Sequence, residues 1–152
     1  MDVLRMRDVG FAASRELLGR HGLQLVEVPE GDAIPGSYWG DDEAGLIGLT
    51  VYARPDTPVH SLLHEASHLL VMSPERRVAV HTDATDSIEE EDATCYLQIV
   101  LADDLPGVGS ERVMQDMDTW GYTFRLGSTK AWFENDAAEA RAYVTGAGYI
   151  SS

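Results

Sequence analysis

The residues with the clearest chemistry are two histidines and a glutamate in the stretch His64-Glu65-Ala66-Ser67-His68. Residues four apart lie above one another on one face of an α-helix, so a helix here would direct the imidazoles of His64 and His68 to one point. Neutral imidazole is a good ligand for Zn²⁺, and the spacing therefore predicts a zinc site. Glu65, rotated by about 100° from His64, would lie beside the metal and serve as general base toward a water molecule.

The sequence around this motif predicts a buried helix over residues 58–72. Asp56-Thr57-Pro58 is typical of a helix start, with Asp56 or Thr57 as the N-cap and the proline in the first turn. Ser73-Pro74 would end the helix. The buried sides would be formed by Leu62, Leu63, Ala66, Leu69, Leu70 and Met72. His60, one turn before His64 on the same face, could contact a metal ligand, but it is expected to be an exposed residue of the first turn.

Composition narrows the classes of protein to which the chain can belong. A chain of 152 residues with 44% hydrophobic residues indicates a single domain over residues 1–152 with a core of its own. The formal net charge of −15 argues against nucleic-acid and anionic-membrane partners, and would favour a basic peptide or protein. The N-terminus is too charged for a secretory signal, and no apolar run is long enough to cross a bilayer, so a cytoplasmic protein is expected.

Hydrophobic periodicity and turn residues predict an α+β fold with a small three-stranded sheet before the motif and helices after it. The expected strands are Leu23–Val28, Ser37–Gly40 and Leu46–Ala53, and the expected helices besides that of the motif are Val3–Arg20, Ser87–Ala102, Ser110–Thr119 and Thr129–Thr145. Ser110 and Ser128 are the expected N-caps of the last two helices. The strand Leu46–Ala53 is the candidate for an open edge to which an extended peptide could pair.

A catalytic zinc normally has three protein ligands, so one must come from outside the motif. Cys95 is the only cysteine, which excludes a cysteine-rich zinc cluster. The acidic run Glu89-Glu90-Glu91-Asp92 opens a predicted helix, in which Glu89 and Glu90 each fall about 50° from the centre of the apolar face. Either could face the motif helix, whereas Glu91 would point away into solvent. The same acids also fit a helix-capping role, with Ser87 and Glu90 as a capping box.

The motif followed by Glu90-Glu91-Asp92-Ala93-Thr94-Cys95-Tyr96-Leu97 resembles the ImmA/IrrE-type metallopeptidases, which belong to the glutamate zincins. The resemblance covers roughly residues 35 to 102 and rests on an E-x-x-A pattern some twenty residues after H-E-x-x-H. It implies a zincin-like fold in which His64, His68 and Glu90 bind Zn²⁺ and Glu65 is the general base. Thr94 departs from the family pattern, because asparagine is common at that position.

The expected function is zinc-dependent hydrolysis of peptide bonds, and the alternative is a non-catalytic zinc-binding regulatory or interaction module of the same fold. Zincins often use a tyrosine or histidine to stabilise the oxyanion. The chain offers several candidates, and the sequence selects none of them: Tyr38, His81, Tyr122, Tyr143 and Tyr149. Three aromatic residues of the C-terminal part are expected to pack helices onto the core: Trp120, Trp132 and Phe133.

Overall fold

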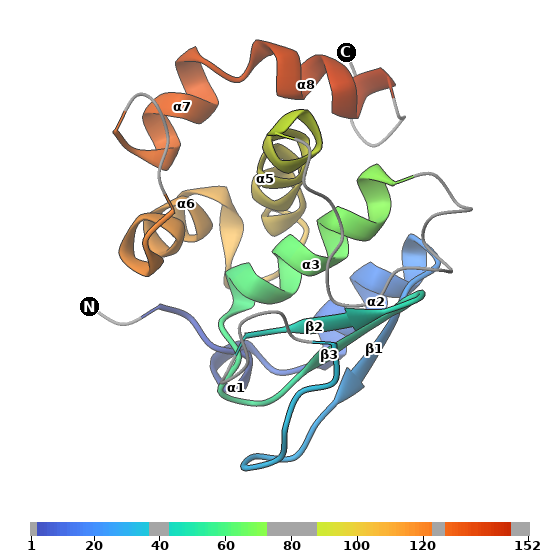
Figure 1. Cartoon of the computed structure of the whole chain (residues 1–152). Helices are drawn as coiled ribbons and strands as arrows, with labels where there is room; N and C mark the ends of the chain where they lie inside the picture. The colour runs from blue at the N-terminus through green and yellow to red at the C-terminus, as the bar shows by residue number, and fades with distance from the viewer. Residues whose placement is uncertain (1–2, 37–42, 73–87, 123–126, 147–152) are drawn as a thin grey trace.

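A computed structural model describes residues 3–36, 43–72, 88–122 and 127–146, and these residues form helices and one small sheet (Figure 1). In chain order the elements are α1 (Met6–Val9), α2 (Ala12–Arg20), β1 (Gln24–Glu27), β2 (Gly45–Ile47), β3 (Thr50–Ala53), α3 (Val59–Val71), α5 (Ile88–Ala102), α6 (Gly109–Trp120), α7 (Thr129–Asn135) and α8 (Ala138–Gly146). The α+β class is therefore confirmed. None of the helices in the described ranges has both the length and the apolar character that a bilayer crossing requires.

The three strands form a mixed sheet with the order β1-β3-β2. β1 runs parallel to β3 and β2 runs antiparallel to it, so that Leu25 and Leu46 both lie opposite Val51. The prediction of one continuous strand over Leu46–Ala53 is wrong, because the chain turns at Gly48, whose φ of 58° is a conformation that glycine adopts without strain. β3 is consequently the central strand, with both edges paired, so of the segment predicted as an open edge only β2 lies at an edge of the described sheet.

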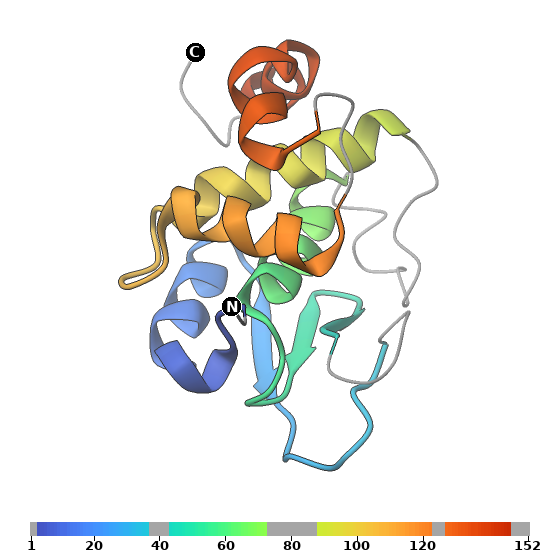
Figure 2. The same ribbon diagram turned by 90° about the vertical axis from the view of Figure 1, so that its left-hand side faces the viewer.

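Helix α3, which carries the motif, lies between the sheet and α5 (Figures 1 and 2). It packs on β2 and β3 on one side and on α5 and α6 on the other. Every residue of α3 is buried except His64 and Glu65, which are partly exposed. The motif is thus the one place on this helix that solvent reaches.

Both ends of α3 lie within one residue of the predicted bounds, but the predicted N-caps Asp56 and Thr57 are wrong. Pro58 is the N-cap and the helix begins at Val59, while Met72 is the C-cap and Ser73 lies beyond it. The N-terminal segment fixes the start of the helix, since the backbone N–H of Met6 donates to the Thr57 carbonyl and that of Val59 to the Leu4 carbonyl.

Two predicted helices are each divided in the structure. The helix expected over Val3–Arg20 is interrupted at Gly10, which has a φ of 79° and separates α1 from α2. The helix expected over Thr129–Thr145 is α7 followed by α8, with Asp136 as the C-cap of α7. The break lets both short helices lie over the same side of α5 (Figure 1). Ser128 is confirmed as an N-cap, because its hydroxyl accepts a hydrogen bond from Ala131 N at 3.1 Å.

The remaining predicted helices are confirmed as α5 and α6. Gly121, with a φ of 107°, ends α6 in the left-handed conformation, whereas its N-cap is Val108 and not Ser110. Trp132 is buried, and Phe133 stacks on Tyr96 with ring centroids 4.7 Å apart, so these aromatic side chains join α7 to α5. The strand expected at Ser37–Gly40 and the proposed cap Ser87 lie outside the described residues.

Candidate metal centre

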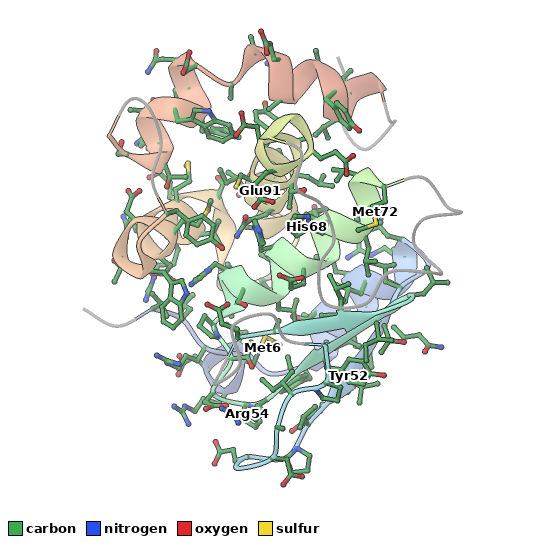
Figure 3. The ribbon with its side chains drawn as sticks, in the orientation of Figure 1. Met6, Tyr52, Arg54, His68, Met72 and Glu91 are labelled. Atoms are coloured by element: carbon green, nitrogen blue, oxygen red, sulfur yellow. The ribbon has the colours of Figure 1, made fainter. Side chains whose placement is uncertain are left out.

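The facing sides of α3 and α5 bring the two histidines of the motif together with Glu91. One carboxylate oxygen of Glu91 lies 2.9 Å from His64 Nε2, and the other lies 3.2 Å from His68 Nε2. Figure 3 shows Glu91 and His68 meeting in the space between the two helices. The rings of His64 and His68 are 4.6 Å apart between centroids and nearly perpendicular. Two imidazole nitrogens and a carboxylate therefore converge, which is a donor set that suits zinc.

The other ring nitrogen of each histidine is held by a side chain of α5. His64 Nδ1 is 2.8 Å from Gln98 Oε1, and the Gln98 amide nitrogen donates to the His60 carbonyl at 2.8 Å, which fixes the orientation of the amide. His68 Nδ1 is 3.4 Å from the Thr94 hydroxyl, which itself donates to the Glu90 carbonyl at 2.8 Å.

These contacts assign the tautomer of both rings. Gln98 Oε1 can only accept a hydrogen bond, and the Thr94 proton is already donated elsewhere, so both Nδ1 atoms carry the hydrogen. Each Nε2 then has a lone pair free for a metal when the ring is neutral. This is the usual arrangement at zinc sites, in which a neighbouring group fixes the tautomer and direction of the ligating histidine. Thr94 thus provides the contact to His68 despite its departure from the family pattern.

The structure corrects the expected direction of Glu91. The sequence argument placed Glu91 in solvent and favoured Glu90, with Glu89 as the alternative, yet Glu91 contacts both histidines while remaining 44% exposed. Neither cluster of possible ligand atoms among the described residues includes Glu90, although its charge acts on His68. The side chain of Glu89 lies outside the described residues.

The error has a physical cause, because the apolar side of α5 does not face α3. Every residue from Ala93 to Ile99 is buried, since α5 packs against α3, α6 and α8. Its apolar side carries Tyr96, which contacts α7. Its polar stripe faces α3 and consists of Glu91, Thr94, Cys95 and Gln98. Measuring angles from the apolar face therefore placed Glu91 on the wrong side of the helix.

Charge is concentrated in the contact between Glu91 and the histidines. Burial acts to raise the pKa of Glu91, but hydrogen bonds from His64 and His68 outweigh it and hold this pKa well below its usual range. Burial acts to lower the pKa of His64, while the hydrogen bond to the Glu91 carboxylate acts in the opposite direction, and the pKa of His64 is raised. Burial dominates at His68 and lowers its pKa. The Glu91 carboxylate thus favours the protonated form of His64, with which it can form an ion pair when no metal is bound.

Glu65 lies beside the histidines, and one of its oxygens is within 4.8 Å of ligand atoms of both. Burial raises the pKa of Glu65 to about 7, with His64 opposing the shift and the charges of Glu91 and Glu43 adding to it. Glu43 precedes β2 and is tied down on both oxygens, which accept hydrogen bonds from the Ser61 hydroxyl at 2.7 Å and from Trp120 Nε1 at 2.8 Å. The predicted position of Glu65 next to the imidazoles agrees with the structure.

Aromatic side chains form the wall of the site toward α6. His60 is only 1% exposed, which makes the expectation of an exposed residue wrong. Its ring lies edge-on to Trp120 and Tyr122 with centroids 5.3 and 5.4 Å away, and its Nδ1 is 3.3 Å from the Tyr122 hydroxyl. Burial, with the nearby charges of His64 and Arg5, lowers the pKa of His60 to about 3. His60 is therefore a neutral packing residue.

Of the tyrosines and histidine considered for oxyanion stabilisation, the structure brings Tyr122 to the site. Its ring is 5.7 Å from that of His64, and burial raises its pKa to about 12, so the hydroxyl keeps its proton. Tyr143 packs against the core from α8. Tyr38, His81 and Tyr149 lie outside the described residues.

Sequence reasoning missed Gln98 and gave Cys95 no role at the site. Cys95 is buried, and its ligand atom lies within 4.8 Å of those of His64 and Glu91. The signal that could have found both is the spacing of polar residues within an apolar helix, since positions 91, 94, 95 and 98 share one face.

In comparisons with known proteins, no family model, no curated protein and no solved structure matches the chain.

Proposed function

We propose that the chain is a zinc-dependent peptidase of the zincin type, similar to the ImmA/IrrE metallopeptidases, in which His64, His68 and Glu91 hold the metal. The observation that supports this best is the Glu91 carboxylate lying against both Nε2 atoms while both Nδ1 atoms are held by α5. An ordinary pair of buried histidines does not need four such contacts. Glu90 stays the alternative third ligand that the resemblance implies.

Bound zinc would supply Lewis acidity toward the scissile carbonyl and lower the pKa of a water molecule to about 7. Glu65 is on the exposed side of α3, next to the histidines, where it can take the proton of the attacking water and pass it to the leaving amine. Gln98 and Thr94 keep the two imidazoles directed at the metal. The Tyr122 hydroxyl is a neutral donor close to His64 that can stabilise developing negative charge on the substrate.

The substrate class inferred is a peptide or protein segment, with a preference for basic residues. The charges of Glu43 and Glu91 both act on Glu65 at the site, and the whole chain has a net charge of −15. Such a surface attracts basic chains and repels nucleic acids and anionic membranes.

Metal analysis combined with peptide cleavage tests this proposal. Wild type should bind one zinc per chain and cleave members of a basic peptide library, and Glu65→Gln should keep the zinc while losing cleavage by about a hundredfold or more. Glu91→Gln should lose zinc, whereas Glu90→Gln serves as the matched control and should retain it. Zinc loss in Glu90→Gln alone would show that the third ligand is assigned wrongly.

Two further results would reject a peptidase. Unchanged zinc content in His64→Ala would place the metal elsewhere in the chain. Full zinc loading of wild type without cleavage of any peptide would favour the non-catalytic module.

A further inference from the structure

The proposed ligands leave one metal-binding side chain of the site without a role, and that side chain is Cys95. It lies on α5 four residues after Glu91, so the two side chains share a face of the helix. The ligand atoms of His64, Glu91 and Cys95 all lie within 4.8 Å of one another, and His64 also belongs to the cluster that contains His68. The site is therefore built from two pairs at the same spacing, His64 with His68 on α3 and Glu91 with Cys95 on α5.

The distances are close to what a metal requires. Zinc binds nitrogen and oxygen at about 2.0 to 2.2 Å and sulfur at about 2.3 Å, so a tetrahedral ion holds its ligand atoms roughly 3.3 to 3.7 Å apart. A contraction of at most about 1.5 Å would bring the sulfur, nitrogen and oxygen atoms of this cluster to that separation, which side-chain rotation can supply. Cys95 is only 5% exposed, so the sulfur faces the site and not bulk solvent.

We propose that Cys95 is a fourth protein ligand of this metal site and, in the resting protein, holds the coordination position that hydrolysis needs open. This inference rests on the proposed function. A catalytic zinc keeps one position for water, whereas four protein ligands make a closed site. On binding, the thiol loses its proton to solvent and sulfur bonds to the metal as thiolate. The peptidase is then inactive until sulfur leaves, and Cys95 sets how much of the protein is active.

Cobalt substitution tests the ligand directly, because Cys95 is the only cysteine of the chain and any thiolate bond must involve it. Protein loaded with one Co²⁺ should show a thiolate-to-cobalt charge-transfer band in the near ultraviolet. Cys95→Ser should lose this band but keep the weaker visible bands of bound cobalt. Cys95→Ser should also weaken binding of Cd²⁺ at least about tenfold more than binding of Zn²⁺, since thiolate favours the softer ion. Cleavage by the zinc form should rise in Cys95→Ser.

Each contrary outcome overturns a specific part of the proposals. Bound cobalt without the charge-transfer band in wild type overturns the sulfur ligand and leaves the peptidase proposal standing, with Cys95 a small packing residue. Failure of wild type to bind any cobalt overturns both proposals together. A charge-transfer band in cobalt-loaded wild type, together with no rise of peptide cleavage in the zinc form of Cys95→Ser, overturns the closed resting state. Thermal melts of the metal-free variants, with Cys95→Ala as a second substitution, separate these outcomes from loss of folding.

Discussion

Replacement of Gln98 by leucine removes the group that fixes the orientation of the His64 ring. The lost hydrogen bonds determine how much the free energy of unfolding should fall. Gln98 is fully buried, accepts from His64 Nδ1 at 2.8 Å and donates to the His60 carbonyl at 2.8 Å. Gln98→Leu leaves a buried His64 N–H without its partner, which costs about 1 to 3 kcal/mol, and removes a second bond with a net value of about 1 kcal/mol. The metal-free protein should thus lose about 2 to 4 kcal/mol in its free energy of unfolding.

The same substitution should weaken metal binding, because the His64 ring would no longer be held with Nε2 toward the metal. Loss of a partner that orients a ligating histidine typically lowers metal affinity 10- to 100-fold, or about 1.4 to 2.7 kcal/mol. Urea unfolding with a chelator measures the first effect, and competition with a chromophoric zinc chelator measures the second. Gln98→Glu keeps an acceptor for His64 and should preserve more of the metal affinity, although its buried charge lowers stability.

Gln115→Leu is the matched control, because Gln115 is an exposed residue of α6 and its replacement should change stability by less than about 0.5 kcal/mol. The reasoning is refuted if Gln98→Leu binds zinc as tightly as Gln115→Leu. It is also refuted if Gln98→Leu and Gln98→Glu lose zinc affinity equally.

Three more predictions follow from the charges and caps. The pKa of His60 is lowered from 6.5 to about 3, so between these pH values the unfolded chain binds a proton that the folded chain does not. The free energy of unfolding should therefore fall by up to about 1.4 kcal/mol per pH unit as pH drops from 6.5 toward 3. Urea unfolding should show a smaller fall in His60→Phe. The pKa of His64 is raised, so zinc binding at pH 7 should release a proton, measurable by calorimetry in buffers of different ionisation enthalpy; no release would contradict the ion pair with Glu91. Ser128→Ala should cost about 1 kcal/mol, whereas Ser110→Ala, which removes no cap, should cost less than about 0.5 kcal/mol in thermal melts.

Short-range sequence signals were sufficient to predict the helix that carries the motif. The proline at its start, the serine and proline after its end, and the leucines between them are short-range signals, and α3 has nearly the predicted bounds. The spacing of His64 and His68 on one face is likewise a property of any α-helix, so their approach needed no tertiary information. The mixed α+β composition followed from the same patterns.

The breaks within predicted strands and helices were harder to predict from the sequence, because they depend on the elements against which the chain packs. Gly48 turns the chain between β2 and β3, although an apolar run with glycine in it can also continue as a strand. α7 and α8 are separated at Asp136, where the weak helix formers Asn135 and Asp136 interrupt a segment rich in alanine and glutamate, and α5 offers both helices one side to cover.

The identity of the acid at the site was decided by tertiary structure alone. A helix with one apolar face buries that face, but α5 is covered on several sides, and its polar stripe of Glu91, Thr94, Cys95 and Gln98 faces the histidines. Buried polar groups must find partners, and in the described residues the partners of these side chains lie on α3 and on α5 itself. The sequence determines that two imidazoles meet at one point; the packing of α5 on α3 determines that Glu91 meets them there.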